Sequence, residues 1–154
     1  MNYWLMKSEP KIYSFDDLKR DRETVWDGVR NYQARNFLRQ MQVGDLAFFY
    51  HSNIAFPGLV GLVRVVATLA DPTQFDPNSR YYEPKSTPEC PRWQTVRVEF
   101  VETFPLISRE TLKQEFSTEE LIVLRQGNRL SVMPVVEKVA LQILALANSK
   151  IAQS

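Results

Sequence analysis

Two apolar, strand-like runs separated by a proline-rich segment constrain the fold of this chain more than any other feature. Residues 58–69 are apolar and rich in β-branched side chains, which predicts a long strand. Residues 93–104 alternate between apolar and polar side chains, which is typical of a half-buried strand. The 71–92 segment between them holds five prolines, so it cannot form a regular helix or a central strand. The chain therefore needs a sheet that is interrupted by one long loop.

The loop carries aromatic side chains that a disordered linker would lack. Phe75, Tyr81 and Tyr82 lie within it, and Trp93 follows it. Long loops inside a compact domain are usually either functional or disordered, and these rings argue against disorder. We therefore expect a packed loop. One hypothesis for the whole chain is a protein-interaction module in which Tyr81, Tyr82 and Trp93 form an exposed surface.

Strand signals elsewhere in the chain add to these two runs. Short strands are expected at residues 3–6, 46–51 and 129–132. A chain of this length buries enough surface for one core, so residues 1–154 are expected to form one domain. The expected architecture is α+β, with about five strands in a curled sheet or barrel and short helices at its periphery.

Three expected helices each follow a capping side chain. Their ranges and caps are 15–19 after Ser14, 32–41 after Asn31, and 109–114 after Ser108. Ser117 and Glu120 predict a further short helix, and Pro134 fits the first turn of a final one. The apolar face of that final helix comprises Val136, Val139, Ala140, Ile143, Leu144 and Ala147.

The formal charge of +1 at neutral pH excludes a global basic field that would draw the protein onto nucleic acid. A local basic patch is still compatible with the sequence, since Arg30, Arg35 and Arg39 lie in one short stretch with Asp27 as its counter-charge. The alternative is that these arginines form a solvated helix face. Aromatic residues make up 12% of the chain, more than a minimal core needs, so some rings are expected to face a ligand.

The cysteine content and the first residues bear on the cellular compartment. Cys90 is the sole cysteine, so no disulfide can form within the chain, which fits a reducing compartment. Residues 1–7 lack the length and flanks of a signal peptide, and no apolar run is long enough to span a bilayer. We expect a cytoplasmic protein without a membrane partner. A monomer is one of several oligomeric states that the sequence leaves open.

Signatures of enzymes are mostly absent from the sequence. His51 is the single histidine and Cys90 the single cysteine, so a multi-histidine or zinc site is not expected. The glycine-rich fingerprints of nucleotide-binding folds and the nucleophile elbow of hydrolases are missing. A catalytic triad around His51 remains open because triads are defined by geometry. An enzyme that acts on nucleotides or nucleic acid, with His51 as general base, is therefore a competing hypothesis.

Four segments rich in aromatic and polar side chains border the ends of expected strands. They are residues 6–10, 26–32, 48–53 and 125–131. In the third, three aromatics lead into His51, Ser52 and Asn53, and a planar heterocycle requires this combination of stacking faces and hydrogen-bonding groups. A structural role is open as well: a lid on the core for Trp26, backbone hydrogen bonds near His51, and an ion pair for Arg129.

These segments resemble the motifs of the EVE domain over about residues 2–146. The matching motifs include YWLMKSEP at residues 3–10, WDGVRNYQARN at 26–36, FFYHSN at 48–53 and RQGNRLSV at 125–132. The resemblance implies a PUA-like fold, a small curled β-barrel of five to six strands with short peripheral helices, related to the PUA, ASCH and YTH domains. It also implies a pocket for one base, modified as in 5-methylcytosine or 5-hydroxymethylcytosine, in DNA or RNA.

The resemblance and the residues together give a hypothesis for the site. YTH domains similarly place a Lys-Ser pair after the first strand and a cage Trp after the first helix, positions that Lys7, Ser8 and Trp26 occupy here. Trp26 and Tyr50 are expected to hold a flipped or single-stranded base without catalysis, metal or cofactor. The edge of the base is expected to contact Ser8, Asn31, His51, Ser52 and Asn53. Phosphates are expected to contact Lys7, Arg30, Arg35 and Arg129.

The chain begins directly with its first expected strand, without the basic, disordered N-terminal extension of the family's nuclear members. This difference favours a domain-only form. Together with the compartment signals above, it favours the cytoplasm.

Overall fold

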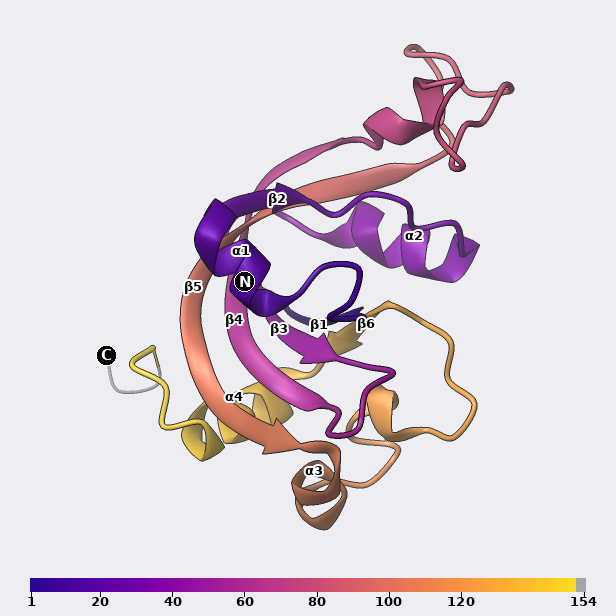
Figure 1. Cartoon of the computed structure of the whole chain (residues 1–154). Helices are drawn as coiled ribbons and strands as arrows, with labels where there is room; N and C mark the ends of the chain where they lie inside the picture. Colours follow the sequence, from indigo (N-terminus) through magenta and orange to yellow (C-terminus); the bar gives the residue numbers. More distant parts are fainter. Residues whose placement is uncertain (152–154) are drawn as a thin grey trace.

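The computed structural model describes residues 1–151 and contains a six-stranded mixed sheet with four α-helices around it (Figure 1). The strands are β1 (Tyr3–Ser8), β2 (Glu23–Val25), β3 (Leu46–His51), β4 (Gly58–Ala70), β5 (Gln94–Ser108) and β6 (Val132–Val135). The helices are α1 (Phe15–Asp21), α2 (Tyr32–Gln40), α3 (Arg109–Glu115) and α4 (Glu137–Leu146). Short 3-10 turns cover Pro72–Phe75 and Ile122–Leu124.

The strand order in the sheet is β2-β5-β4-β3-β1-β6. β1 and β3 are parallel, and the other neighbours are antiparallel. β4 and β5 are long and strongly curved (Figure 1), because their pairing shifts register near Leu59, Leu62 and Val65 and such bulges bend a strand. Within the described residues β2 does not pair with β6, so the curled sheet stays open. The predicted α+β class with five to six strands is confirmed, but the barrel does not close.

The two faces of the sheet carry separate apolar cores because side chains alternate along each strand. In β3, Phe48 and Tyr50 belong to the core under α3 and α4, whereas Phe49 belongs to the core under α1 and α2. Leu5 and Met6 in β1 divide in the same way. Alternation therefore decides which side chains of β1 and β3 reach the α1–α2 side of the sheet.

Three helices begin at their predicted caps. Ser14 Oγ accepts the N–H of Asp17 at 3.0 Å, and the Asp17 carboxylate accepts the N–H of Ser14 at 2.9 Å, which completes a capping box. Asn31 and Ser108 cap α2 and α3 with their side-chain oxygens. The ends of these helices lie within two residues of the predicted ones.

The proline-rich segment is packed, as its aromatic content predicted. The buried side chain of Gln74 donates to the carbonyl oxygens of Asp71 at 2.8 Å and Trp93 at 2.7 Å. Its Oε1 accepts the N–H of Trp93 at 3.1 Å. These bonds fasten the two ends of the loop to each other, at the points where β4 ends and β5 begins.

The C-terminal part differs from the prediction. The strand predicted at residues 129–132 lies at Val132–Val135 instead, and Pro134 belongs to this strand rather than to the first turn of α4. An edge strand such as β6 tolerates a residue without an N–H group. Val136 precedes α4 and is exposed, so it is not part of the helix's buried face.

The prediction also differs from the structure at one expected helix and at one short strand. Ser117 and Glu120 exchange hydrogen bonds of 2.9 and 3.2 Å, but the residues between them form a turn instead of a helix. β2 was not predicted, because its three residues are too few to show an alternating pattern.

Candidate nucleic-acid interface

A cavity of about 550 Å³ lies on the α1–α2 side of the sheet, where β1 ends. Its walls are residues 7–9, 12–13 and 24–31, with Tyr81 and Ser131. Its volume is in the range of small-molecule binding sites. The cavity therefore brings together residues from three of the four sequence segments, namely the end of β1, the turn before α2 and Ser131, with one residue from the proline-rich loop.

Trp26 forms one wall of this cavity and also part of the core. Its indole packs edge-on against Phe49, with ring centroids 5.5 Å apart and an interplanar angle of 84°. Its backbone is fixed as well, because the N–H donates to the carbonyl of Val96 at 2.9 Å and the carbonyl accepts the hydroxyl of Thr95. Only 9% of the residue is exposed. The two roles weighed for Trp26, core lid and cavity wall, are therefore combined in one side chain.

Tyr50 does not lie opposite Trp26, which corrects the predicted slot between these two rings. Strand alternation places Tyr50 with Phe48 in the core under α3 and α4, on the other face of the sheet. Its burial there raises the pKa of the phenol above its ordinary value. The prediction failed because it used the nearness of Tyr50 to the polar end of β3 and ignored the face on which each residue of that strand lies.

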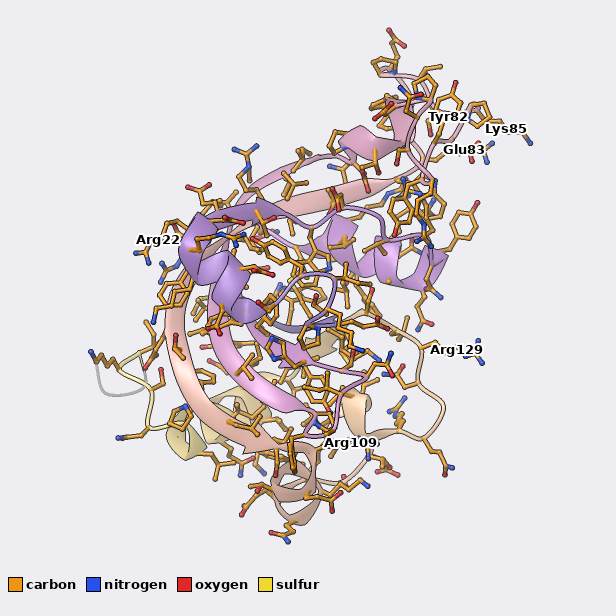
Figure 2. All side chains as sticks on the ribbon, in the orientation of Figure 1. Arg22, Tyr82, Glu83, Lys85, Arg109 and Arg129 are labelled. Atoms are coloured by element: carbon orange, nitrogen blue, oxygen red, sulfur yellow. The ribbon has the colours of Figure 1, made fainter. Side chains whose placement is uncertain are left out.

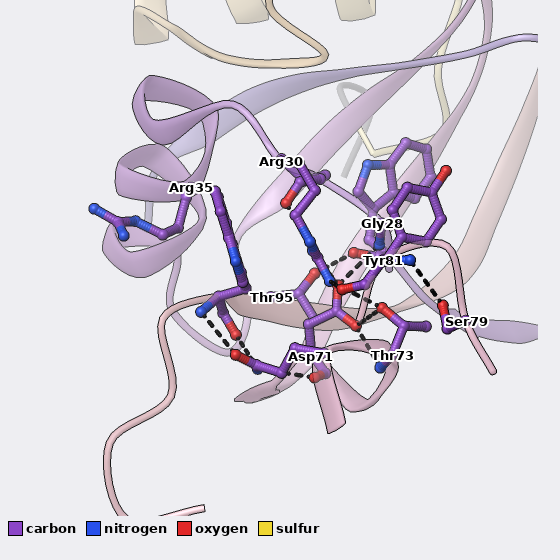
Figure 3. A network of polar contacts seen from close by, with 12 residues as sticks. Gly28, Arg30, Arg35, Asp71, Thr73, Ser79, Tyr81 and Thr95 are labelled. Atoms are coloured by element: carbon purple, nitrogen blue, oxygen red, sulfur yellow. Dashed lines mark hydrogen bonds and ion pairs between the residues drawn. The ribbon is translucent and has the colours of Figure 1, made fainter. Parts of the chain in front are cut away.

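Tyr81 lines the cavity together with Tyr13 and Trp26, although the sequence predicts it on an exposed partner surface. Its ring lies against Gly28. The guanidinium of Arg30 stands over the same ring at 5.2 Å from its centroid, and that of Arg80 at 5.1 Å. The N–H of Tyr81 donates to Ser79 Oγ at 3.1 Å, as Figure 3 shows. The only sequence signal for this role was the aromatic content of the proline-rich loop.

Arg30 holds the loop in place and is not a free phosphate ligand, which corrects its predicted role. Its Nη1 pairs with the buried carboxylate of Asp71 at 3.1 Å (Figure 3). Its Nη2 donates to Thr73 Oγ1 at 3.1 Å and to the carbonyl of Tyr81 at 2.8 Å. The same guanidinium lies 4.9 Å from the ring centroid of Trp93. With these partners Arg30 fastens the proline-rich loop to the turn before α2.

Asp71 is the centre of this polar network. It accepts the N–H of Gly28 at 2.8 Å and the N–H of Thr73 at 2.8 Å, in addition to the bond from Arg30. Burial alone would raise the pKa of Asp71, but the hydrogen bonds outweigh burial and hold the pKa below its ordinary value. The carboxylate therefore stays ionised as the anchor of Arg30.

Arg35 lies on a basic surface that we call the arginine surface, formed by Arg35, Arg39 and Arg92. Its guanidinium stands 4.6 Å from the ring centroid of Tyr32, and Tyr32 stacks on Trp93 at 4.9 Å. Arg35 and Arg39 both donate to the carbonyl oxygen of Arg92, at 3.0 and 3.3 Å. No carboxylate lies within ion-pair distance of these three guanidinium groups in the described part of the chain. Partial burial and the charge of Arg39 lower the pKa of Arg35.

Three polar residues that the sequence assigns to one site all line the cavity: Lys7, Ser8 and Asn31. The hydroxyl of Ser8 donates to the carbonyl of Tyr13 at 2.6 Å. Asn31 Oδ1 accepts the N–H of Ala34 at 2.9 Å as the cap of α2, and its amide NH₂ makes no hydrogen bond with the described residues. Burial, and then the nearby charge of Arg109, lower the pKa of Lys7.

His51, Ser52 and Asn53 lie beside the cavity but are not among its lining residues. The Nε2 of His51 accepts the N–H of Phe15 at 3.0 Å, at the start of α1. Burial lowers the pKa of His51, which favours the neutral ring that this bond requires. Asn53 Nδ2 donates to Glu9 Oε1 at 3.3 Å. These contacts fit a structural role for residues 51–53. A general base would use the Nε2 lone pair of His51, which already accepts the hydrogen bond from Phe15.

Arg129 lies outside the main cavity, on the loop between α3 and β6. It is exposed, and Figure 2 shows it projecting away from the sheet. It lines a second, shallower depression of about 430 Å³ together with Asn31 and residues 125–128. Its guanidinium makes no ion pair with the residues that the structure describes. Since Asn31 borders both hollows, Arg129 lies on the same side of the molecule as the cavity.

Comparison with known proteins places this chain among those with an EVE domain, whose family model matches residues 2–146. Thymocyte nuclear protein 1 of Mus musculus is 41% identical over 169 residues, which cover 97% of this chain and 75% of that protein. A crystal structure from Pseudomonas putida is 48% identical with a TM-score of 0.87, over 94% of this chain and 99% of that one. The human THYN1 protein in complex with 5-methylcytosine-containing DNA is 38% identical with a TM-score of 0.85, over 97% and 99% of the chains.

The comparison corrects the expected location. The curated relatives from mouse, human and rat are named as nuclear proteins, so the prediction of a cytoplasmic protein is wrong. The physical reason is that a reducing environment, the basis of the prediction from Cys90, is common to the cytoplasm and the nucleus. Among the helices that the structure describes, none has the length and apolar character needed to cross a membrane.

Proposed function

This chain belongs to the EVE-domain family, and we propose that it binds DNA by holding one base, extruded or single-stranded, in the cavity beside Trp26. The observation that carries the proposal is the cavity itself. It joins an immobilised indole, the rings of Tyr13 and Tyr81 and polar side chains in one space of about 550 Å³. The human THYN1 complex with 5-methylcytosine-containing DNA supports the choice of DNA and of a modified base.

Stacking on Trp26 and Tyr81 supplies the part of the affinity that does not depend on the base sequence of the DNA. Each base stacked on an aromatic side chain contributes roughly 1–3 kcal/mol. Trp26 is held by Phe49 and by backbone hydrogen bonds, and Tyr81 is held by Arg30, so little side-chain entropy is lost when a base binds. The edge of the base contacts Ser8, Asn31 and Lys7.

The preference for a methylated base is expected to be modest if it depends on the methyl group alone. One buried carbon contributes only about 0.8 kcal/mol, which is a few-fold in affinity. A larger preference requires that the unmodified base leave a polar group of the cavity without a partner. Methylation therefore adjusts affinity, whereas the polar groups select the base.

Phosphates contact the arginine surface and Arg129. Asn31 lines the cavity and is followed directly by Tyr32, on which Arg35 is stacked. A strand whose base lies in the cavity thus passes over the start of α2 and meets guanidinium groups that have no carboxylate partner within the part of the chain that the structure describes. Such contacts make the affinity fall as salt rises.

Binding without catalysis fits the environment of His51. The enzyme hypothesis needs this imidazole as a general base, but the ring stays neutral and uses its Nε2 to cap α1. A residue in that state holds the polypeptide in place. The function we propose for the chain is accordingly recognition.

The test compares three single variants in binding to a fluorescently labelled single-stranded oligonucleotide with one central 5-methylcytosine. Trp26→Ala and Tyr81→Ala are expected to weaken binding about 5- to 100-fold, the equivalent of one lost stacking contact. Tyr82→Ala is the matched control, because Tyr82 is adjacent in sequence but lies at the outer end of the loop, away from the cavity (Figure 2). Thermal melting establishes that each variant is folded. Equal affinities for all three variants would contradict the proposal.

A further inference from the structure

Asp27 lines the cavity between Trp26 and Gly28, and its carboxylate has no partner among residues 1–151. Its backbone N–H donates to the carbonyl of Val25 at 3.0 Å. Its side chain, in contrast, forms no ion pair and accepts no hydrogen bond from another of the described residues. An ionised carboxylate offers about four acceptor positions and no donor, so this wall of the cavity presents unused acceptors.

The other carboxylates near the cavity are engaged. Glu9 also lines the cavity, and its Oε1 accepts a hydrogen bond from Asn53. Asp71 is buried behind the turn and is paired with Arg30. Because Arg30 is committed to Asp71 at 3.1 Å, it leaves Asp27 without a hydrogen-bonding cation. A ligand in the cavity therefore contacts the carboxylate of Asp27 while the acceptor positions of that carboxylate are unused.

The electrostatic surroundings of Asp27 favour a ligand that donates hydrogen bonds. Partial burial and the negative charge of Asp71 raise the pKa of Asp27, while its own backbone N–H and the charge of Arg30 lower it to a smaller extent. The ionised form is thus less well solvated than it would be in water. The residue is exposed, so a donor from the ligand would replace water at the carboxylate.

We propose that Asp27 selects a cytosine-type base by accepting a hydrogen bond from its exocyclic amino group, and that it rejects thymine and uracil. The proposal rests on the proposed function, since it requires a base in the cavity. Cytosine presents an amino donor at N4, to which Asp and Glu are suitable acceptors. Thymine presents a carbonyl oxygen at the same position. Two acceptors would then face each other without a proton, and an unpaired polar group in a partly enclosed site lowers affinity strongly.

Two oligonucleotides that differ at one base test this assignment. One carries a central 5-methylcytosine and the other a central thymine, so both bases have the same C5 methyl group and differ in the amino or carbonyl group at position 4 and the proton at N3. The wild-type chain is expected to bind the 5-methylcytosine strand at least 10-fold more tightly. In Asp27→Asn the ratio is expected to fall to about one or to invert, because the amide NH₂ can donate to the carbonyl of thymine.

Asp16→Asn is the matched control, since it removes the same charge from an exposed aspartate on α1 that does not line the cavity. It is expected to keep the wild-type ratio. If Asp27→Asn also keeps the wild-type ratio, or if the wild-type chain binds both strands equally, Asp27 does not select the base, although binding in the cavity still stands. If the wild-type chain binds neither strand, the proposed function itself fails.

Discussion

Gly28 and Tyr81 are in such close contact that no side chain fits between them. A Cβ added at Gly28 would lie 2.7 Å from Cε2 of the Tyr81 ring, and the backbone of Gly28 has a φ of +79°. The contact joins residues far apart in sequence, and it sets the position of the Tyr81 ring in the cavity. A turn without a side chain is what allows the proline-rich loop to form part of the binding site.

Gly28→Ala is therefore expected to displace Tyr81 and weaken oligonucleotide binding. Gly44→Ala is the control, because Gly44 also has a positive φ, +98°, but no atom within 4 Å of an added Cβ, and it lines neither hollow. Both variants lose about 1–2 kcal/mol of unfolding free energy from the left-handed backbone, and only Gly28→Ala has the additional clash. The measurements are urea unfolding and fluorescence anisotropy. Equal loss of binding in both variants would mean that the contact with Tyr81 is unimportant.

Arg30→Leu is expected to destabilise the fold by about 2–4 kcal/mol, because it leaves the buried carboxylate of Asp71 without its cation. Arg64→Leu removes an arginine from a more exposed pair with Glu99, of similar length at 3.2 Å. That variant is expected to lose no more than about 1 kcal/mol. Chemical denaturation measures both. The prediction is refuted if the two losses are the same.

The arginine surface predicts a specific change in salt dependence. Replacing both Arg39 and Arg92 by Gln is expected to lower the slope of log affinity against log salt by about 0.7 for each phosphate contact to a single strand. The preference for 5-methylcytosine over thymine should not change, because backbone contacts carry no direct base information. The control replaces Lys113 and Lys138, on α3 and α4, by Gln. An unchanged slope in the first variant would exclude this surface from DNA binding.

Protonation of His51 is expected to destabilise the folded chain in weakly acidic solution. The pKa of His51 is lowered by burial in the folded state, so the unfolded chain binds a proton at higher pH. Stability from this group is thus fully present above the ordinary histidine pKa, and it is lost as the pH falls through the folded value. His51 is the sole histidine. Unfolding free energies from pH 7.5 down to pH 5 should fall more steeply for the wild type than for His51→Gln, and parallel curves would contradict this.

Local signals in the sequence predicted most of the fold. Capping residues such as Ser14 and Asn31 and the long β-branched run of β4 fixed the positions of their elements, because these signals act within a few residues. The errors lie where tertiary structure decides. Pro134 is compatible with both a first helical turn and an edge strand, and pairing of β6 with β1 selects the strand.

The candidate site was only partly predictable, for two physical reasons. Tyr50 was placed in it although the period-2 alternation of β3 turns this residue to the opposite face. Tyr81 was not placed in it, since nothing in the sequence reveals that the loop folds back over Gly28. Arg30 resembles a phosphate ligand by composition, and its pairing with Asp71 is visible only in three dimensions.

The position of β1 in the sheet also has a consequence for how the chain acquires its structure. β1 is synthesised before β3 and β6, but it lies between them in the sheet, and Tyr3 is aligned with Val135. One side of β1 therefore has no partner strand until β6 has also emerged from the ribosome. Such long-range pairing slows folding and leaves an apolar strand edge open in the meantime. A nascent chain stalled before β6 should accordingly be recognised by chaperones and cut by proteases, whereas one that includes β6 can complete the sheet.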